Sequence, residues 1–147
     1  MSSLLSRRGF NIRSLAVGET DNPGISRMTI IAECGPEESG QILAQIRKLE
    51  CVREAAILEP AGCVSRELLM VKIGAAAKTR SEIIEIANIF RARIVDVSNK
   101  SLTLELTGET DKTAALLELL RGYGIIEAAR TGVIALSRGE RGVGGGA

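Results

Sequence analysis

Apolar and polar residues along this chain follow two different periods, and the change of period marks the predicted elements. Over residues 101–107 the period is two, with Leu102, Leu104 and Leu106 on one side and polar residues on the other. Such alternation predicts a strand in a sheet with one buried face. Strands are also predicted at residues 11–19, 27–34, 52–58, 67–74, 94–97 and 124–135.

A period near 3.6 predicts helices between these strands. Pro36 suits the first turn of a helix over residues 36–49, whose apolar positions are Ile42, Leu43, Ile46 and Leu49. Thr79 and Glu82 have the spacing of a capping box and predict a helix behind them. Further helices are predicted at residues 111–120 and, as a short segment, at residues 1–9.

The order of these elements repeats along the chain. The second half is expected to run strand, helix, strand, strand, helix, strand, and the first half gives the same order without the opening strand. We therefore predict an α+β protein of two ferredoxin-like βαββαβ halves, the first missing its opening strand, which is expected upstream of Met1. The predicted boundaries are a domain at 1–60, a linker at 61–65, a domain at 66–137 and a disordered Gly-rich tail at 138–147.

Composition narrows the function classes. A net charge of +1 and 2% aromatic residues argue against nucleic-acid binding. The absence of histidine removes Ser-His and Cys-His nucleophile pairs, and no carboxylate spacing suggests acid–base catalysis. Three scattered cysteines, Cys34, Cys51 and Cys63, favour a reducing compartment over a disulfide framework. An independent small enzyme is the least favoured class.

The candidate site residues are polar groups beside predicted element ends. Asn11 follows the first predicted helix, and the residue types alone favour a capping or turn asparagine over a ligand-binding one. Arg66 and Glu67 are interpreted as linker or interface charges. The charges of residues 91–98 are interpreted as a solvated rim.

Several runs together resemble one known family. They are residues 8–12, 14–18, 66–72, 89–98, 101–108 and 129–132. In this order they are similar to the small subunit of acetolactate synthase, also called acetohydroxyacid synthase, and the resemblance covers nearly all of residues 1–138.

The resemblance implies an N-terminal ACT domain and a C-terminal ACT-like domain without catalytic activity of their own. It implies a homodimer that activates a catalytic subunit and confers feedback inhibition by valine or related branched-chain amino acids, in the biosynthesis of valine, leucine and isoleucine. Thiamine diphosphate, magnesium and FAD are expected in that catalytic partner, and no cofactor or metal in this chain. Asn11 and Ile12 match the family's effector-binding pair, whereas the loop that follows the first strand in the family has no counterpart among these residues.

One alternative function stays open, a free-standing ACT-type amino-acid sensor that regulates a different enzyme. The runs at 66–72 and 90–98 favour the acetolactate synthase subunit, because sensors of other enzymes need not carry them. No partner nucleic acid or membrane is expected, since no apolar run approaches the roughly 20 residues of a membrane span. The expected location is the cytoplasm, or a plastid if the natural N-terminus is longer.

Overall fold

The computed structural model describes residues 9–143, and their contacts divide the chain into two units. The second unit is Arg66–Gly132, and the first unit combines the residues before it with the segment that begins at Val133. The chain thus passes between the units twice, after Ser65 and after Gly132. The helix predicted at residues 1–9 lies outside the described residues except for Gly9, and the last four residues of the predicted tail also lie outside them.

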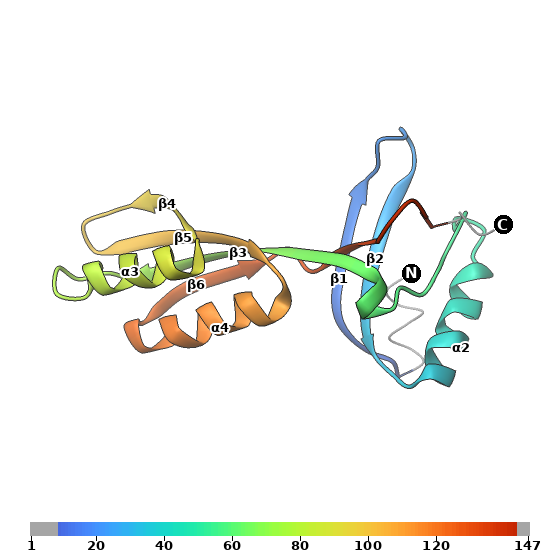
Figure 1. Cartoon of the computed structure of the whole chain (residues 1–147), viewed down its shortest axis with the longest axis horizontal. Helices are drawn as coiled ribbons and strands as arrows, with labels where there is room; N and C mark the ends of the chain where they lie inside the picture. The colour runs from blue at the N-terminus through green and yellow to red at the C-terminus, as the bar shows by residue number, and fades with distance from the viewer. Residues whose placement is uncertain (1–8, 144–147) are drawn as a thin grey trace. The chain divides into compact units, whose positions relative to one another are not determined.

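The second unit is a complete βαββαβ fold, as its sequence pattern predicts. Its antiparallel sheet has the strand order β4-β5-β3-β6, with β3 between β5 and β6. The elements are β3 (Cys63–Gly74), α3 (Arg80–Phe90), β4 (Arg93–Val97), β5 (Ser101–Gly108), α4 (Thr110–Leu120), the short 3-10 turn η2 (Arg121–Tyr123) and β6 (Ile125–Arg130). Helices α3 and α4 lie on the same side of this sheet (Figure 1).

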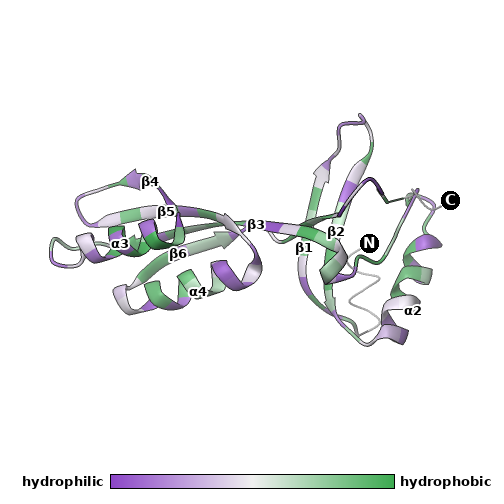
Figure 2. Cartoon of the chain, in the orientation of Figure 1, coloured by the Kyte–Doolittle hydropathy of each residue, from purple (hydrophilic) through white to green (hydrophobic). Residues whose placement is uncertain are grey.

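The core of the second unit lies between the sheet and these two helices. Val71 of β3 pairs with Leu104 of β5, and both side chains are fully buried. The alternation predicted for β5 is therefore confirmed, with its leucines inside. Figure 2 shows hydrophobic residues on both the strands and the helices that meet here. The buried cluster contains Leu69, Val71, Ile73, Ala75, Ile83, Ala87, Leu102, Leu104, Leu106, Leu116 and Leu120.

The first unit contains a smaller sheet. Strands β1 (Asn11–Glu19) and β2 (Ser26–Glu33) form an antiparallel hairpin, and helix α2 (Pro36–Arg47) follows with Ile42 buried. Gly24 closes the turn between the strands with a φ of +82°, a conformation that favours glycine. The 3-10 turn η1 (Pro60–Gly62) leads into β3. Strand β7 (Ile134–Ser137) pairs with β3 and belongs to this unit.

The prediction of a strand at residues 52–58 is wrong. These residues form no helix or strand, and the guanidinium of Arg47 donates a hydrogen bond of 2.8 Å to the carbonyl of Ala55. In the second unit the equivalent strand, β6, pairs with β3. Among the described residues of the first unit no strand occupies the place of β3 beside β2, so residues 52–58 have no ladder to join.

Two further predictions need correction. Thr79 has helical backbone angles (φ −109°, ψ −9°) and caps no N–H with its side chain, so the capping box is absent and its hydroxyl bonds to the carbonyl of Ala76 instead. The strand region predicted at residues 124–135 is divided at Gly132 into β6 and β7. The residues predicted as a linker, 61–65, fall on η1 and the first part of β3.

Candidate effector site

Asn11 and Ile12 lie at the first turn-to-strand junction of the described chain. Gly9 precedes them with a φ of +74°, and Asn11 is the first residue of β1. The side chain of Asn11 is exposed and that of Ile12 is half-buried. Ile12 lies opposite Ala32 of β2, and a bulge at Arg13 follows it. The structure therefore brings an exposed amide and a partly buried apolar side chain to one end of the hairpin.

Glu33 is the polar partner of this end. It lies opposite Asn11 in the β1–β2 register, and Asn11 Nδ2 donates a hydrogen bond of 2.8 Å to its Oε2. Its other carboxylate oxygen forms an ion pair with Arg13. The sequence interpretation of Asn11 as a capping residue misses this contact. The antiparallel hairpin could have indicated it, because the start of the first strand must lie opposite the end of the return strand.

The first turn of α2 begins just beyond Glu33. Gly35 and the three residues after it line an open hollow of about 670 Å³. The backbone N–H of Gly35 donates a hydrogen bond of 3.0 Å to the carboxylate of Glu38, which satisfies one of the donors at this helix end. The end of the hairpin thus offers an amide and a guanidinium that contact one carboxylate, with the half-buried Ile12 beside them in β1.

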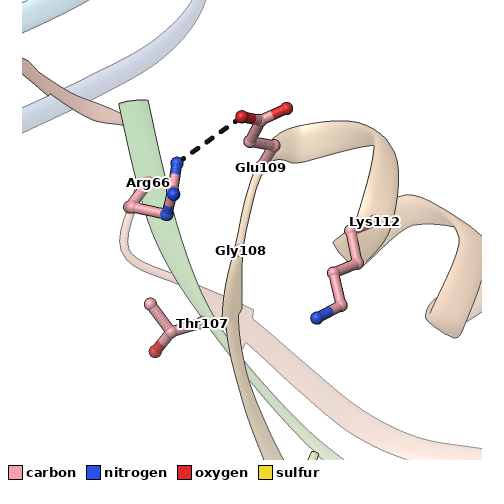
Figure 3. A pocket seen from close by; sticks show the side chains of 5 residues that line it. All are labelled: Arg66, Thr107, Gly108, Glu109 and Lys112. Carbon is pink, nitrogen blue, oxygen red and sulfur yellow. Dashed lines mark ion pairs between the residues drawn. The ribbon is translucent and has the colours of Figure 1, made fainter. Parts of the chain in front are cut away.

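The second unit contains a polar end of a different kind. An open hollow of about 390 Å³ is lined by Arg66, Thr107, Gly108, Glu109 and Lys112. Arg66 forms an ion pair of 3.5 Å with Glu109, and Lys112 lies on the other side of the strand that carries Gly108 (Figure 3). The side chains of both partners are largely exposed.

Glu67, the next residue, is the opposite case and corrects the sequence interpretation. It is only 4% exposed and is bound by Arg130 and Thr113, so it is no surface charge. Burial raises the pKa of the Glu67 carboxyl, but hydrogen bonds from Arg130 and Thr113 and the charge of Arg130 lower it more, so the pKa lies below its ordinary value. Its position could have been predicted, because it is in phase with Leu69 and Val71 on the inward face of β3.

The remaining candidate charges behave as expected. Every residue of β4 is exposed, so the charges at residues 93–97 form a solvated edge. Within residues 9–143 no group of His, Cys, Asp or Glu side chains is arranged to hold a metal ion. In that same range no helix is long and apolar enough to cross a membrane.

Comparison with known proteins assigns both halves of the chain. A family model described as the small subunit of acetolactate synthase matches residues 66–139, and one described as an AHAS small subunit-like ACT domain matches residues 1–54. The chain is 54% identical to the probable acetolactate synthase small subunit of Methanothermobacter thermautotrophicus, over 96% of this chain and 84% of that protein. The chain belongs to the acetolactate synthase small subunit family.

Other members of this family agree. The acetolactate synthase small subunit of Mycolicibacterium smegmatis is 51% identical over 98% of this chain and 85% of its own length. The crystal structure of the acetolactate synthase small subunit from Thermotoga maritima superposes with a TM-score of 0.87 at 35% identity, covering 95% of this chain and 88% of that one. The family resemblance and the ferredoxin-like ACT fold predicted from the sequence are confirmed.

Proposed function

We propose that this chain is the regulatory subunit of an acetolactate synthase, which activates the catalytic subunit and confers feedback inhibition by valine or a related branched-chain amino acid. The observation that carries the proposal is the match of both halves, the ACT domain and the C-terminal domain, to small-subunit families. Thiamine diphosphate, magnesium and FAD then belong to the catalytic partner. The scattered cysteines support a reducing compartment, for which we propose the cytoplasm.

Reconstitution with the catalytic subunit tests this proposal. The purified chain alone, given pyruvate, thiamine diphosphate and magnesium, is expected to form no acetolactate, because its sequence has no histidine and no carboxylate pair spaced for acid–base chemistry. Added to the catalytic subunit, it is expected to raise turnover. Pyruvate turnover by the isolated chain, or unchanged turnover of the catalytic subunit at saturating amounts of the chain, would refute the proposal.

For the effector site we propose Asn11 and Ile12, in a homodimer whose ACT domains share the ligand. An amino acid carries two charges, and each must exchange its hydration for protein partners on binding. The amide of Asn11 uses its nitrogen for Glu33, so its carbonyl oxygen can accept a hydrogen bond from the ligand's ammonium group. Ile12 is half-buried and can contact an aliphatic side chain.

Calorimetry with valine tests the assignment. Asn11→Ala is expected to weaken valine binding at least tenfold, because the ligand loses a hydrogen bond to one of its charged groups. Asn88→Ala is the matched control, since Asn88 is an exposed asparagine on α3 of the other unit. The Asn88→Ala chain should bind valine with the affinity of the unmodified chain. Equal affinities for the two variants would exclude Asn11 as a ligand.

The second candidate function is a free-standing ACT-type sensor of a different enzyme. The AHAS-type ACT domain at residues 1–54 is the observation that keeps it open. Valine binding by a chain that never raises the turnover of an acetolactate synthase catalytic subunit would favour this alternative.

A further inference from the structure

Two family-like motifs that the proposed function does not use meet at one end of the second unit. The first is Arg66-Glu67-Leu68 at the point where β3 enters this unit, and the second is Arg130-Thr131-Gly132 at the point where the chain leaves it. Leu69 lies opposite Arg130 in the β3–β6 register, so the two motifs are neighbours across the sheet. Their side chains form one connected set of contacts.

The centre of this set is the buried carboxylate of Glu67. Its Oε1 accepts hydrogen bonds from Nη2 of Arg130 and from the hydroxyl of Thr113. The same Nη2 lies 3.2 Å from the Thr113 oxygen, which is also 2.9 Å from the carbonyl of Thr110. Thr113 is fully buried in α4, so the carboxylate ties β3, β6 and the start of α4 together.

Thr131 joins the same two strands through one backbone hydrogen bond and one side-chain hydrogen bond, both to Leu68. Its N–H donates to the carbonyl of Leu68 at 3.0 Å, and its hydroxyl oxygen accepts the N–H of Leu68 at 3.0 Å. The next residue, Gly132, has a φ of +83°, which turns the chain out of the strand direction. In the second motif, Arg130 therefore binds Glu67, Thr131 makes hydrogen bonds to Leu68 of β3, and Gly132 turns the chain out of the direction of β6.

We propose that Glu67, Thr113, Arg130 and Thr131 form a clasp that fixes the two connections between the units to one another. The chain crosses between units immediately before Arg66 and immediately after Gly132, within two residues of the clasp on each strand. A displacement of one connection must therefore carry the other with it. The clasp also transmits the effector-bound state of the first unit to the second, a step that rests on the proposed function.

The burial of the Glu67 carboxylate makes partial opening of the clasp costly. A buried carboxylate that loses its guanidinium partner keeps the desolvation penalty without the compensating charge, so a partly open clasp is strongly disfavoured. The ion pair of Lys72 with Glu127, 2.7 Å long, joins the same two strands, but its carboxylate side chain is 69% exposed, whereas the side chain of Glu67 is 3% exposed. Exposed pairs contribute little, and this pair is therefore the natural control.

Hydrogen exchange in the full chain tests the clasp by itself. Glu67→Met combined with Arg130→Met replaces the ion pair by apolar side chains and avoids leaving the Glu67 carboxylate buried without its partner. We expect backbone amides of residues 131–137 to exchange at least tenfold faster than in Glu127→Gln, with amides of β5 unchanged. Thr131→Val, which removes the acceptor of the Leu68 N–H, should act in the same direction and decides the matter if the double variant does not fold. Exchange equal to that of Glu127→Gln overturns the clasp.

The reconstituted enzyme tests the transmission. In the complex with the catalytic subunit, Thr131→Val should still activate, and its calorimetric affinity for valine should be unchanged. The valine concentration for half-inhibition should rise at least tenfold relative to Glu127→Gln. Equal half-inhibition in the two variants overturns the transmission. A wild-type chain that neither activates nor responds to valine overturns the proposed function and the transmission together, whereas the exchange result on the clasp still stands.

Discussion

At the scale of single residues, two buried polar side chains of the second unit differ in their hydrogen bonding. The carboxylate of Glu67 accepts hydrogen bonds from Arg130 and from the hydroxyl of Thr113. Thr103 of β5 is 9% exposed, and among the described residues its hydroxyl has no hydrogen-bond partner. It lies opposite Lys72 of β3 and Asp96 of β4, but its hydroxyl oxygen forms a hydrogen bond with neither. The hydrogen bonds to Glu67 offset the cost of burying its carboxylate, whereas the buried Thr103 hydroxyl destabilises the folded state because it has lost its hydration without a replacement.

Thr103→Val is therefore expected to stabilise the chain. Valine has nearly the same shape, removes the unsatisfied hydroxyl and suits a strand. We expect the free energy of unfolding to rise by about 1 kcal/mol, measured by urea denaturation. Thr107→Val is the control, because Thr107 lies on the same strand with an exposed hydroxyl and should change stability little. A loss of stability in Thr103→Val would show that the hydroxyl is satisfied in solution.

The lowered pKa of Glu67 gives a prediction on acid stability. A carboxyl whose folded pKa lies below its unfolded value binds protons more readily when unfolded, so its stabilisation is fully present above the unfolded pKa. It is lost as the pH falls through the folded pKa. The difference in unfolding free energy between wild type and Glu67→Gln should thus be constant near neutral pH and shrink below about pH 4.5. A difference that grows on acidification would contradict this sign.

At the scale of elements, β5 is the strand whose buried leucines the sequence pattern predicts most directly. Leu104 is fully buried and lies between Ile94 of β4 and Val71 of β3. Leu104→Ala should destabilise the chain by about 2–5 kcal/mol, as large-to-small changes in a packed core do. Leu119→Ala is the control, since Leu119 is 52% exposed on α4. Similar unfolding midpoints for the two variants would show that the core near Leu104 can collapse around the cavity.

The pattern along the chain predicts elements well where local period and long-range pairing agree. In the second unit each predicted strand has its ladder partner, so β3, β4 and β5 form near the predicted positions. Residues 52–58 have a strand-like composition, but no strand among the described residues pairs with them, and composition alone cannot supply a partner. The clasp shows the same limit for sites. The inward phase of Glu67 is visible in the sequence, but its contact with Arg130 depends on the register between β3 and β6.

At the scale of the whole molecule, the described parts of the two units differ in the sheets that they contain. Strand β3 pairs with a strand on each side, so its backbone groups are satisfied in both directions. In the first unit, β1 and β2 form a sheet of two strands, and such hairpins are marginal without further packing. Among the described residues of this unit, the buried apolar side chains are Ala16, Ile42, Val133 and Ala135, which are fewer and smaller than those in the core cluster of the second unit.

This difference predicts how the chain opens. Backbone amides of β3 and β5 should exchange slowest in native-state hydrogen exchange, since they are released only when the core of the second unit unfolds. Amides of β1 and β2 should exchange faster, through local opening of the hairpin. Because both units belong to the same chain, each serves as the internal reference for the other under one set of conditions. Slower exchange in β1 and β2 than in β5 would mean that packing against other parts of the first unit, or against a second copy, stabilises the hairpin more than its own ladder does.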